Sequence, residues 1–286
     1  MKLSIITINY NNVEGLRKTL ASVASQTYRN IEHVIIDGGS TDYSVDVIRD
    51  YEHSVFRNQK SAYTILWVSE KDNGIYNAMN KGIRKTSGDY IQILNSGDIF
   101  AAPDVTERMV TELERLEYPS ILYGNMLKSY DMKTIIHRDT CGNGMYTPES
   151  FLYFYKGTLN HDCAYIRRNL FEKYGLYNEQ MKICSDWEWY VRAIVLGGEN
   201  PVYTNIDVTI FDMNGVSESY GKNAELIKKE RREYLEKILP ATILHDYDTF
   251  SFPVLQYQRL KKYHLWGLVN FIERVFFKFE KWHILR

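Results

Sequence analysis

The sequence predicts an α/β protein built on a mostly parallel, doubly wound sheet with helices on both faces. Short apolar runs rich in β-branched residues alternate with segments of helical periodicity, and small polar loops separate them. Such alternation is typical of right-handed βαβ units. The 286 residues, 44% hydrophobic and 25% charged, are also enough to bury a sizeable core.

The elements can be placed in order along the chain. The first four strands are expected at residues 3–10, 31–36, 64–68 and 90–94, each followed by a helix. Asn11 and Asn12 end the first strand and can cap a helix that buries Leu16 and Leu20. Further strands are expected at 121–124, 134–137 and 202–211, and a charged helix at 223–239.

Charge and cysteine usage limit the class of protein. The formal net charge is −1, so no overall field attracts nucleic acid, and no nucleic-acid partner is expected. Cys141, Cys163 and Cys184 are odd in number and lack CxxC spacing, which argues against a disulfide framework or a structural zinc site. Without a leader-like N-terminus or an apolar run near the ~20 residues of a membrane span, a cytoplasmic protein is expected.

Polar and acidic residues follow the predicted strands in phase. Tyr10, Asp37, Asp72 and Asp98 each come shortly after the end of a successive strand, where they can converge on one crevice. A single Asp at such a position is more often a turn or cap residue, but a series of them is less easily explained that way. Since neither GxGxxG nor GxxxxGK[ST] occurs, a dinucleotide dehydrogenase and a P-loop NTPase are disfavoured. An acid-lined crevice suits a nucleotide whose diphosphate is neutralised by a divalent cation.

Four motifs occur along the same strand ends. They are SIITINYNN at 4–12, DGGSTD at 37–42, KDNGIYNAMNKG at 71–82 and NSGD at 95–98. In this order they resemble the consecutive signatures of family 2 glycosyltransferases, over residues 3–215. The resemblance implies a Rossmann-like GT-A fold, inverting transfer from a nucleotide sugar, with UDP-sugars favoured, a glycan or lipid-linked acceptor, and Mn²⁺ or Mg²⁺ as cofactor.

The resemblance also implies site residues. Tyr10, Asp37 and Asp72 would contact the base and ribose of the nucleotide, and Asp98 would be the metal-binding acid of the DxD-like motif. The further candidates in these motifs are Ile8, Gly39 and Asn80 for the nucleotide and Ser96 for a sugar. Many family members carry an acid where Gly97 stands here, which lowers the metal affinity expected of this chain.

His161 has two interpretations. Residues 160–168 resemble the family segment in which a His precedes a strand and a helix, although the usual neighbour is Gln and here it is Asp162. A lone His is more often a hydrogen-bonded structural residue. Beside a metal site with few acids, however, a neutral imidazole is a sensible additional metal ligand or diphosphate contact.

The segment around Asp186 contains the candidate general base. Helical spacing of apolar residues predicts a helix that begins near Ser185, and Ser185 with Glu188 fits a capping box. That box would leave the Asp186 carboxylate free to face the crevice, whereas the alternative makes Asp186 the N-cap itself. By resemblance, Asp186 matches the catalytic base of inverting members, and Glu188 is the second candidate. Trp187 and Trp189 could stack on a sugar, although core packing is the commoner role of such residues.

The C-terminal part is expected to be a separate extension. The sequence divides into a GT-A domain at 1–220 and a helical extension at 221–286, and flexible loops are expected at 142–144 and 217–220. Residues 250–286 contain seven Lys or Arg against two Asp or Glu, a balance of +5, and apolar residues keep helical phase from Leu265 onward. Such a helix suits an anionic membrane surface, which predicts a peripheral protein on the inner face of the membrane. The alternatives are packing on the catalytic domain and a homodimer contact.

Two other functions fit the strand-end acids less well. A sugar-1-phosphate nucleotidyltransferase would carry a Gly-rich loop with a basic residue just past the first strand, and this loop is missing. A degenerate nucleotide-sugar-binding scaffold would not need both Asp98 and Asp186. The sequence therefore favours an active glycosyltransferase of hexosyl or N-acetylhexosaminyl type, in cell-surface polysaccharide biosynthesis.

Overall fold

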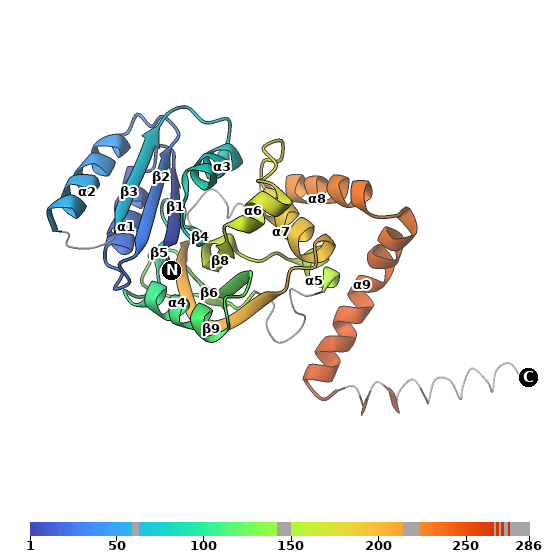
Figure 1. Cartoon of the computed structure of the whole chain (residues 1–286). Coiled ribbons are helices and arrows are strands. Elements are labelled where there is room, and N and C mark those ends of the chain that lie inside the picture. Colours follow the sequence, from blue (N-terminus) through green and yellow to red (C-terminus); the bar gives the residue numbers. More distant parts are fainter. Residues whose placement is uncertain are drawn as a thin grey trace, which may run out of the picture.

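The computed structural model describes residues 1–58, 63–141, 150–213 and 223–265, with 267–268, 270–271 and 274 beyond them. A nine-stranded sheet runs through these residues in the order β3-β2-β1-β4-β8-β6-β9-β5, with β7 paired to β6 (Figure 1). Three sequence predictions concern residues outside these ranges: the loops at 142–144 and 217–220, and most of the helix expected from Leu265 onward.

One half of the sheet is parallel. It consists of β1 (Leu3–Asn9), β2 (Ile31–Asp37), β3 (Thr64–Ser69) and β4 (Tyr90–Ile93). Every residue of β1 and β2 is buried, since α1 (Val13–Ala24) and α2 (Ser44–Asn58) lie on one side and α3 (Ile75–Lys85) on the other (Figure 1). These elements confirm the predicted α/β class and the first four strands.

The other half of the sheet is mixed. Its strands are β8 (Ala164–Arg167), β6 (Ile121–Ser129), β9 (Pro201–Asp212), β5 (Ile99–Phe100) and β7 (His137–Asp139). β8 runs antiparallel to both β4 and β6, whereas β6 and β9 are parallel. The helices of this half are α4 (Val105–Arg115), α5 (Phe151–Lys156), α6 (Asn169–Tyr174) and α7 (Ser185–Tyr190), with a short 3₁₀ turn η1 (His161–Cys163) and a π-helical turn η2 (Val191–Leu196). The predicted strands at 121–124 and 134–137 correspond to β6 and β7, although β7 begins only at His137, whereas the antiparallel insertion of β8 between β4 and β6 was not predicted.

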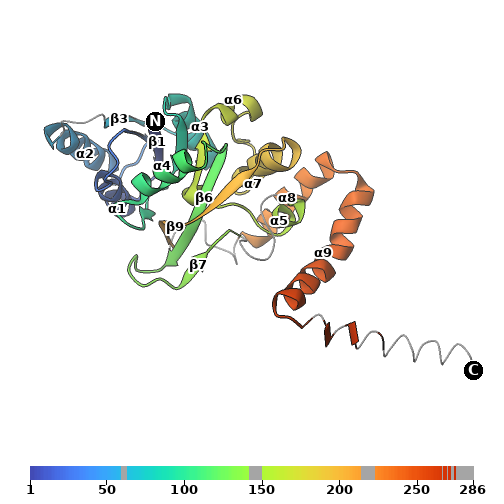
Figure 2. The same cartoon turned by 60° about the horizontal axis from the view of Figure 1, so that its bottom comes forward.

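Two helices follow the sheet. The helix α8 (Ala224–Ile238) confirms the predicted charged helix, and α9 (Ala241–Lys262) comes next. Leu235 and Leu244 lie in the same buried core as the sheet, so the beginning of this region packs on the rest of the protein. The remainder of α9 extends away from it (Figure 2). Of the helices described, none is both long and apolar enough to cross a membrane.

Candidate active site

A cavity of about 950 Å³ opens at the carboxyl ends of the parallel strands. Its walls are formed by Ile8–Asn12, Gly38, Gly39, Lys71, Asp72, Gly74, Ile75, Ala78, Asn95–Asp98, Phe211 and Asp212. Open α/β sheets bind their ligands at this edge, and the volume is at the upper end of ligand pockets. Most of these residues come from loops after β1, β2, β3 and β4, as expected from the strand-end pattern.

Several predicted site residues do line this cavity. The structure places Ile8, Tyr10, Gly39, Asp72, Ser96 and Asp98 on its walls. The Tyr10 ring is 68% exposed, and the Asp72 carboxylate is held by Lys81 Nζ at 2.6 Å. A Cβ on Gly38 would lie 3.1 Å from both Asp72 Oδ2 and Tyr10 Cδ2, so glycine lets these two side chains approach the same loop. A planar aromatic rim beside a carboxylate suits a base and a ribose.

Asp37 is placed differently from the prediction. Its carboxylate has no exposed surface and accepts hydrogen bonds from Asn9 Nδ2, Ser40 N, Ser40 Oγ and Ser69 Oγ at 2.6–2.9 Å. Burial opposes ionisation, but these hydrogen bonds hold the pKa of Asp37 below its ordinary value. The predicted direct contact with the nucleotide is not what the structure shows: Asp37 anchors the loop that follows β2.

Asn80 is also a correction. Its side chain is buried and lies outside the cavity walls, with Nδ2 donating to Tyr177 O at 2.9 Å and to Glu179 Oε1 at 2.8 Å. Its Oδ1 accepts the N–H of Tyr177 at 3.0 Å. Because both ends of the amide are used in these contacts, Asn80 ties α3 to the chain before α7 and does not face a nucleotide.

Asp98 is firmly held at the wall of the cavity. Its Oδ1 accepts the N–H of Asp212 at 2.9 Å, while Thr19 Oγ1 lies 2.7 Å from its carbonyl and 3.0 Å from the N–H of Gly97. Gly97 has φ = +113°, a backbone conformation that favours glycine. This explains the departure from the family motif, since an acid there would be strained. Burial, followed by the charge of Asp162, raises the pKa of Asp98 well above its ordinary value.

The donor set at this wall fits a hard divalent cation. Asp98 and Asp212 both line the cavity, and burial of a carboxylate beside other acids favours a bound cation. Within the described part of the chain, no three His, Cys, Asp or Glu side chains come together to hold a metal ion. Mg²⁺ is commonly held by one or two carboxylates together with the substrate phosphates.

His161 lies in a hydrogen-bonded network beside Asp186. Its Nδ1 lies 3.2 Å from Asp186 Oδ2, and its Nε2 lies 3.0 Å from Asn95 Nδ2 and 3.4 Å from Asp162 Oδ1. Burial alone would lower the pKa of His161, but the carboxylates of Asp162 and Asp186 raise it to about 9. Asp186 therefore faces Nδ1 of the ring, and Asp162 and Asn95 face Nε2. A contact of His161 with a metal ion or a diphosphate stays a prediction.

Asp186 is held from two sides. Its Oδ1 lies 3.1 Å from the Tyr76 hydroxyl and its Oδ2 is the partner of His161, while its side chain remains 15% exposed. Burial opposes ionisation, but the hydrogen bond and charge of His161 outweigh it and lower the pKa of Asp186. The carboxylate is therefore ionised and fixed in orientation. Asn95 lines the cavity and contacts His161, so it connects Asp186 to the cavity wall.

The start of α7 corrects the predicted capping box. The helix does begin at Ser185, but Ser185 Oγ accepts the N–H of Asn178 at 2.6 Å and Cys184 is the N-cap. The buried Glu188 carboxylate pairs with Arg192 at 2.8 Å. Glu188 is therefore engaged in an ion pair within the helix, which argues against its predicted roles as a sugar contact or second base.

The two tryptophans are core residues, so their predicted contact with a sugar is wrong. Trp187 and Trp189 are 1% and 0% exposed. Trp187 Nε1 donates to the carbonyl of Phe154 at 2.7 Å, and Trp189 Nε1 donates to the carbonyl of Gly175 at 2.8 Å. Trp189 also stacks on Phe171, with 4.6 Å between the ring centroids. Both rings are covered by protein and pack in the core, which is the commoner role of such residues.

Sequence reasoning missed three residues of the site. Asp212 directly follows the strand predicted at 202–211, so the strand-end rule applied to the first four strands could have found it. Tyr76 and Asn95 lie inside quoted motifs, but their contacts with Asp186 and His161 depend on the packing of α3 and β4 against η1 and α7. No local pattern predicts such contacts.

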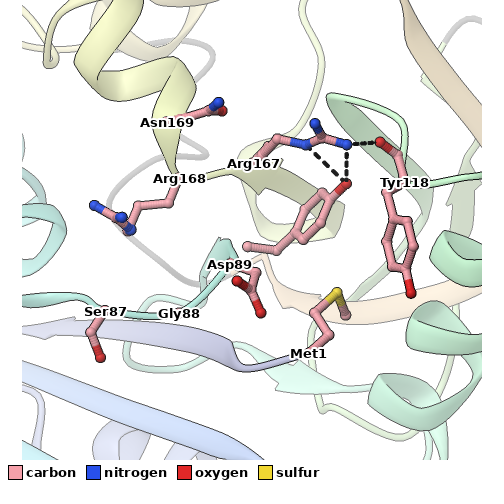
Figure 3. A pocket seen from close by; sticks show the side chains of 9 residues that line it. Met1, Ser87, Gly88, Asp89, Tyr118, Arg167, Arg168 and Asn169 are labelled. Atoms are coloured by element: carbon pink, nitrogen blue, oxygen red, sulfur yellow. Dashed lines mark hydrogen bonds between the residues drawn. The ribbon is translucent and has the colours of Figure 1, made fainter.

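A second cavity, of about 550 Å³, lies at the other end of the sheet (Figure 3). Met1, Asp89, Tyr118, Arg167 and Arg168 are among its lining residues, and the Arg167 guanidinium bonds the Tyr90 hydroxyl and the Tyr118 carbonyl (Figure 3). It adjoins the amino ends of β1 and β4 and contains none of the predicted site residues. The larger cavity is therefore the candidate donor site.

Comparison with known proteins identifies the family of this chain. The model of the family described as "Glycosyl transferase family 2" matches residues 4–175. An uncharacterized glycosyltransferase of Mycobacterium tuberculosis is 34% identical over 217 residues, which cover 75% of this chain and 76% of that protein.

Solved structures show the same fold at low identity. Staphylococcus aureus TarS 1–349 in complex with UDP-GlcNAc has a TM-score of 0.56 and 17% identity, over 74% of this chain and 58% of that chain. The mannosyltransferase PcManGT of Pyrobaculum calidifontis, in complex with GDP-Man and Mn²⁺, has a TM-score of 0.61 and 17% identity, over 92% of this chain and 72% of that chain. The structural likeness establishes the GT-A fold, and with the family match it shows that this chain is a member of glycosyl transferase family 2.

Proposed function

We propose that this glycosyltransferase moves a hexosyl or N-acetylhexosaminyl group from a nucleotide sugar to a glycan or lipid-linked acceptor, with inversion at the anomeric carbon. UDP-sugars are the preferred donors, and the product belongs to a cell-surface polysaccharide. The solved UDP-GlcNAc complex of TarS supports the choice of donor class, and the GDP-Man complex of PcManGT supports a nucleotide sugar in general. The cavity of about 950 Å³ has room for such a donor.

The observation that carries this proposal is the geometry of Asp186. Its ionised carboxylate is oriented by Tyr76 and His161 and remains partly exposed. It is not among the residues that line the cavity and is connected to the cavity wall through His161 and Asn95. In our mechanism Asp186 takes the proton of the acceptor hydroxyl as that oxygen bonds to the anomeric carbon. The bond from that carbon to the diphosphate oxygen breaks, its electron pair stays on the diphosphate, and single displacement inverts the centre.

The cavity walls supply the donor contacts. Tyr10 and Asp72, with Ile8 and Gly39 beside them, would bind the base and ribose, and Ser96 would face the sugar. Asp98 and Asp212 would hold the divalent cation, Mn²⁺ or Mg²⁺, which neutralises the charge of the departing diphosphate when it is bound. The presence of Mn²⁺ in the PcManGT complex supports this cofactor.

The Asp186→Asn variant tests the proposal. It keeps the shape of the side chain and removes the proton acceptor, so turnover should fall by about 10² to 10⁴. Donor-nucleotide affinity by calorimetry should change little, because no residue of the cavity wall is altered. The melting temperature should fall, because the ion pair with His161 is lost. Asp104→Asn, at the exposed N-cap residue before α4, whose side chain makes no capping hydrogen bond, is the matched control. Near-normal turnover of Asp186→Asn would move the base to another residue.

We also propose that the region after α8 binds an anionic membrane surface peripherally. Phe250, Phe252 and Val254 are exposed on α9, where it extends from the rest of the molecule (Figure 2). Exposed aromatic residues next to the basic residues of 250–286 support a surface helix that dips into lipid headgroups. The division into a domain at 1–220 and an extension at 221–286 stays a prediction, as does the homodimer alternative.

A further inference from the structure

A carboxylate of helix α8 binds the chain segment that leads into α7. Glu230 accepts the backbone N–H groups of three consecutive residues, Lys182, Ile183 and Cys184, at 2.7, 3.1 and 3.0 Å. Its side chain is 9% exposed. Hydrogen bonds from backbone N–H groups to a buried carboxylate are charge-assisted and are stronger than neutral ones. Residues 182–184, called here the strap, are therefore held by a helix of the C-terminal region.

This carboxylate differs from the other acids around it. Glu233 and Glu236, on the same helix, are largely exposed and pair with Lys229 and Arg232. Glu230 instead turns into the protein, where it accepts the N–H of the N-cap residue Cys184 and those of the two residues before it. The first N–H groups at a helix start need acceptors, and here the acceptor for the strap lies 46 to 48 residues away in the chain.

The strap is also the link to Asp186. The Tyr76 hydroxyl lies 2.5 Å from the carbonyl of Ile183 and 3.1 Å from Asp186 Oδ1. Glu230 thus accepts the N–H groups of the strap, while the single hydroxyl proton of Tyr76 lies between a carbonyl of the strap and the carboxylate of the base. Cys184, the last residue of the strap, is the N-cap of the helix whose second residue is Asp186. A displaced strap would move the base.

Packing beside these hydrogen bonds supports the same connection. Arg231 lies over the Trp187 ring, 5.0 Å from its centroid, and the Tyr234 ring meets Trp187 edge-on at 5.8 Å. One turn of α8 therefore supplies Glu230, which contacts the strap, and Arg231 and Tyr234, which contact α7. A turn of α8 that contacts both the strap and the first turn of α7 can set the orientation of that helix.

We propose that Glu230 is a positioning residue for Asp186, so that α8 of the C-terminal region completes the active site. This inference rests on the proposed role of Asp186 as the base. Glu230 touches no substrate, and its effect passes through the strap. A displacement of about 1 Å at reacting groups can cost on the order of a hundredfold in rate, so loss of this anchor should appear in turnover.

Glu230→Gln is the first test, with Glu233→Gln on the same helix as the matched control. The Gln variant keeps the shape but places an NH₂ group against backbone N–H donors, so at least one hydrogen bond is lost. We expect kcat, measured well below the melting temperature, to fall roughly 10-fold to 100-fold. The KM for the donor and the calorimetric affinity for UDP should stay within about twofold of the parent enzyme, since the donor cavity is untouched. Glu233→Gln should retain the parent kcat.

Glu230→Asp covers the case in which the Gln variant does not fold. It keeps the charge and shortens the reach by one methylene, so its kcat should lie between those of the parent and the Gln variant. Unchanged kcat in both variants would overturn the proposal. Parallel losses of kcat, UDP affinity and melting temperature would also overturn it, because they would indicate a general structural role.

A double variant separates this inference from the proposed function. If Glu230 acts through the base, then adding Glu230→Gln to Asp186→Asn should cause little further loss of turnover. Full additivity of the two losses would overturn the positioning role while leaving Asp186 as the base. Normal turnover of Asp186→Asn alone would instead reject the proposed base, and the positioning role would fall with it.

Discussion

Tyr10, Asp72 and Asp98 reach the donor cavity because each follows a parallel strand by a few residues, whereas Asp186 depends on side chains from several distant elements. On the donor side, the sheet edge itself brings the loops together. On the base side, Tyr76 is 110 residues and His161 25 residues from Asp186 in the chain. The donor side can thus be inferred from local pattern, while the base side exists only when the whole fold has formed.

Two buried histidines show the same contrast in electrostatics. His33, in β2, sits between Thr7 Oγ1 at 3.0 Å and the Tyr51 hydroxyl at 2.9 Å, and burial lowers its pKa to about 3. His161 is buried too, but the carboxylates of Asp162 and Asp186 raise its pKa to about 9. The parallel half therefore has a neutral histidine between two hydroxyl groups, and the base side has a histidine among acids.

The largest expected effect concerns acid stability of the parallel half. His33 has an ordinary pKa of 6.5 when unfolded and about 3 when folded, so the unfolded chain binds the extra proton between these values. The stability that neutral His33 contributes to the folded protein is fully present above pH 6.5 and is lost as the pH falls towards 3. The free energy of unfolding should fall by about 1.4 kcal/mol per pH unit because of this group.

Denaturant unfolding at pH 7 and pH 4.5 checks this effect. His33→Gln should show a smaller loss of unfolding free energy between the two pH values than the parent protein, although it is less stable at pH 7. His53→Gln, at an exposed position of α2, should keep the parent slope. If the unfolding free energy of His33→Gln fell with pH as steeply as that of the parent protein, groups other than His33 would cause the acid sensitivity.

The next effect concerns the core beneath the base. Trp189→Ala should lower the free energy of unfolding by roughly 3 to 5 kcal/mol, because it removes a buried ring that stacks on Phe171. Trp189→Phe retains an aromatic ring and should lose less. The acceptor KM of Trp189→Phe should remain normal. A raised acceptor KM with a normal melting temperature would support a contact between Trp189 and the acceptor sugar, contrary to the burial of this residue.

A smaller effect is expected for the metal at the donor side. Asp98→Asn can still accept the N–H of Asp212, so the loop should persist, but the charge that attracts a cation is gone. The increase in UDP affinity on adding Mn²⁺ should shrink at least about tenfold, which corresponds to about 1.4 kcal/mol. Calorimetry with and without Mn²⁺ measures it, with Asp104→Asn as control. If Mn²⁺ increased the UDP affinity of Asp98→Asn as much as that of the parent protein, the cation would bind at other residues.

The smallest effect concerns the membrane surface. Lys261→Ala, at an exposed position of α9, should weaken binding to anionic vesicles by about 1 kcal/mol, or roughly fivefold. Lys229→Ala on α8 should not change binding, and added salt should weaken it for all variants. Vesicle sedimentation provides the measurement. Equal pelleting of the parent and Lys261→Ala would favour packing or a dimer contact for this region.

The sequence by itself determined the α/β class, the first strands and the residues at their ends. The capping of α1 shows why: Asn12 Oδ1 accepts the N–H of Gly15 at 3.1 Å, three positions along the chain. Such contacts depend on neighbours in sequence, so residue type and periodicity report them. The same rule placed Tyr10, Asp72 and Asp98 at one edge, because parallel strands must end together.

Only the tertiary structure decided how the base is held. The local pattern at 185–188 predicted a capping box, yet Ser185 binds Asn178, Glu188 binds Arg192, and the strap before α7 is capped by Glu230. The Trp187 and Trp189 faces, free in principle to meet a sugar, are covered by α8, α5 and α6. Whether a polar group or a ring faces solvent depends on what packs over it, and that is set by chain segments far away in sequence.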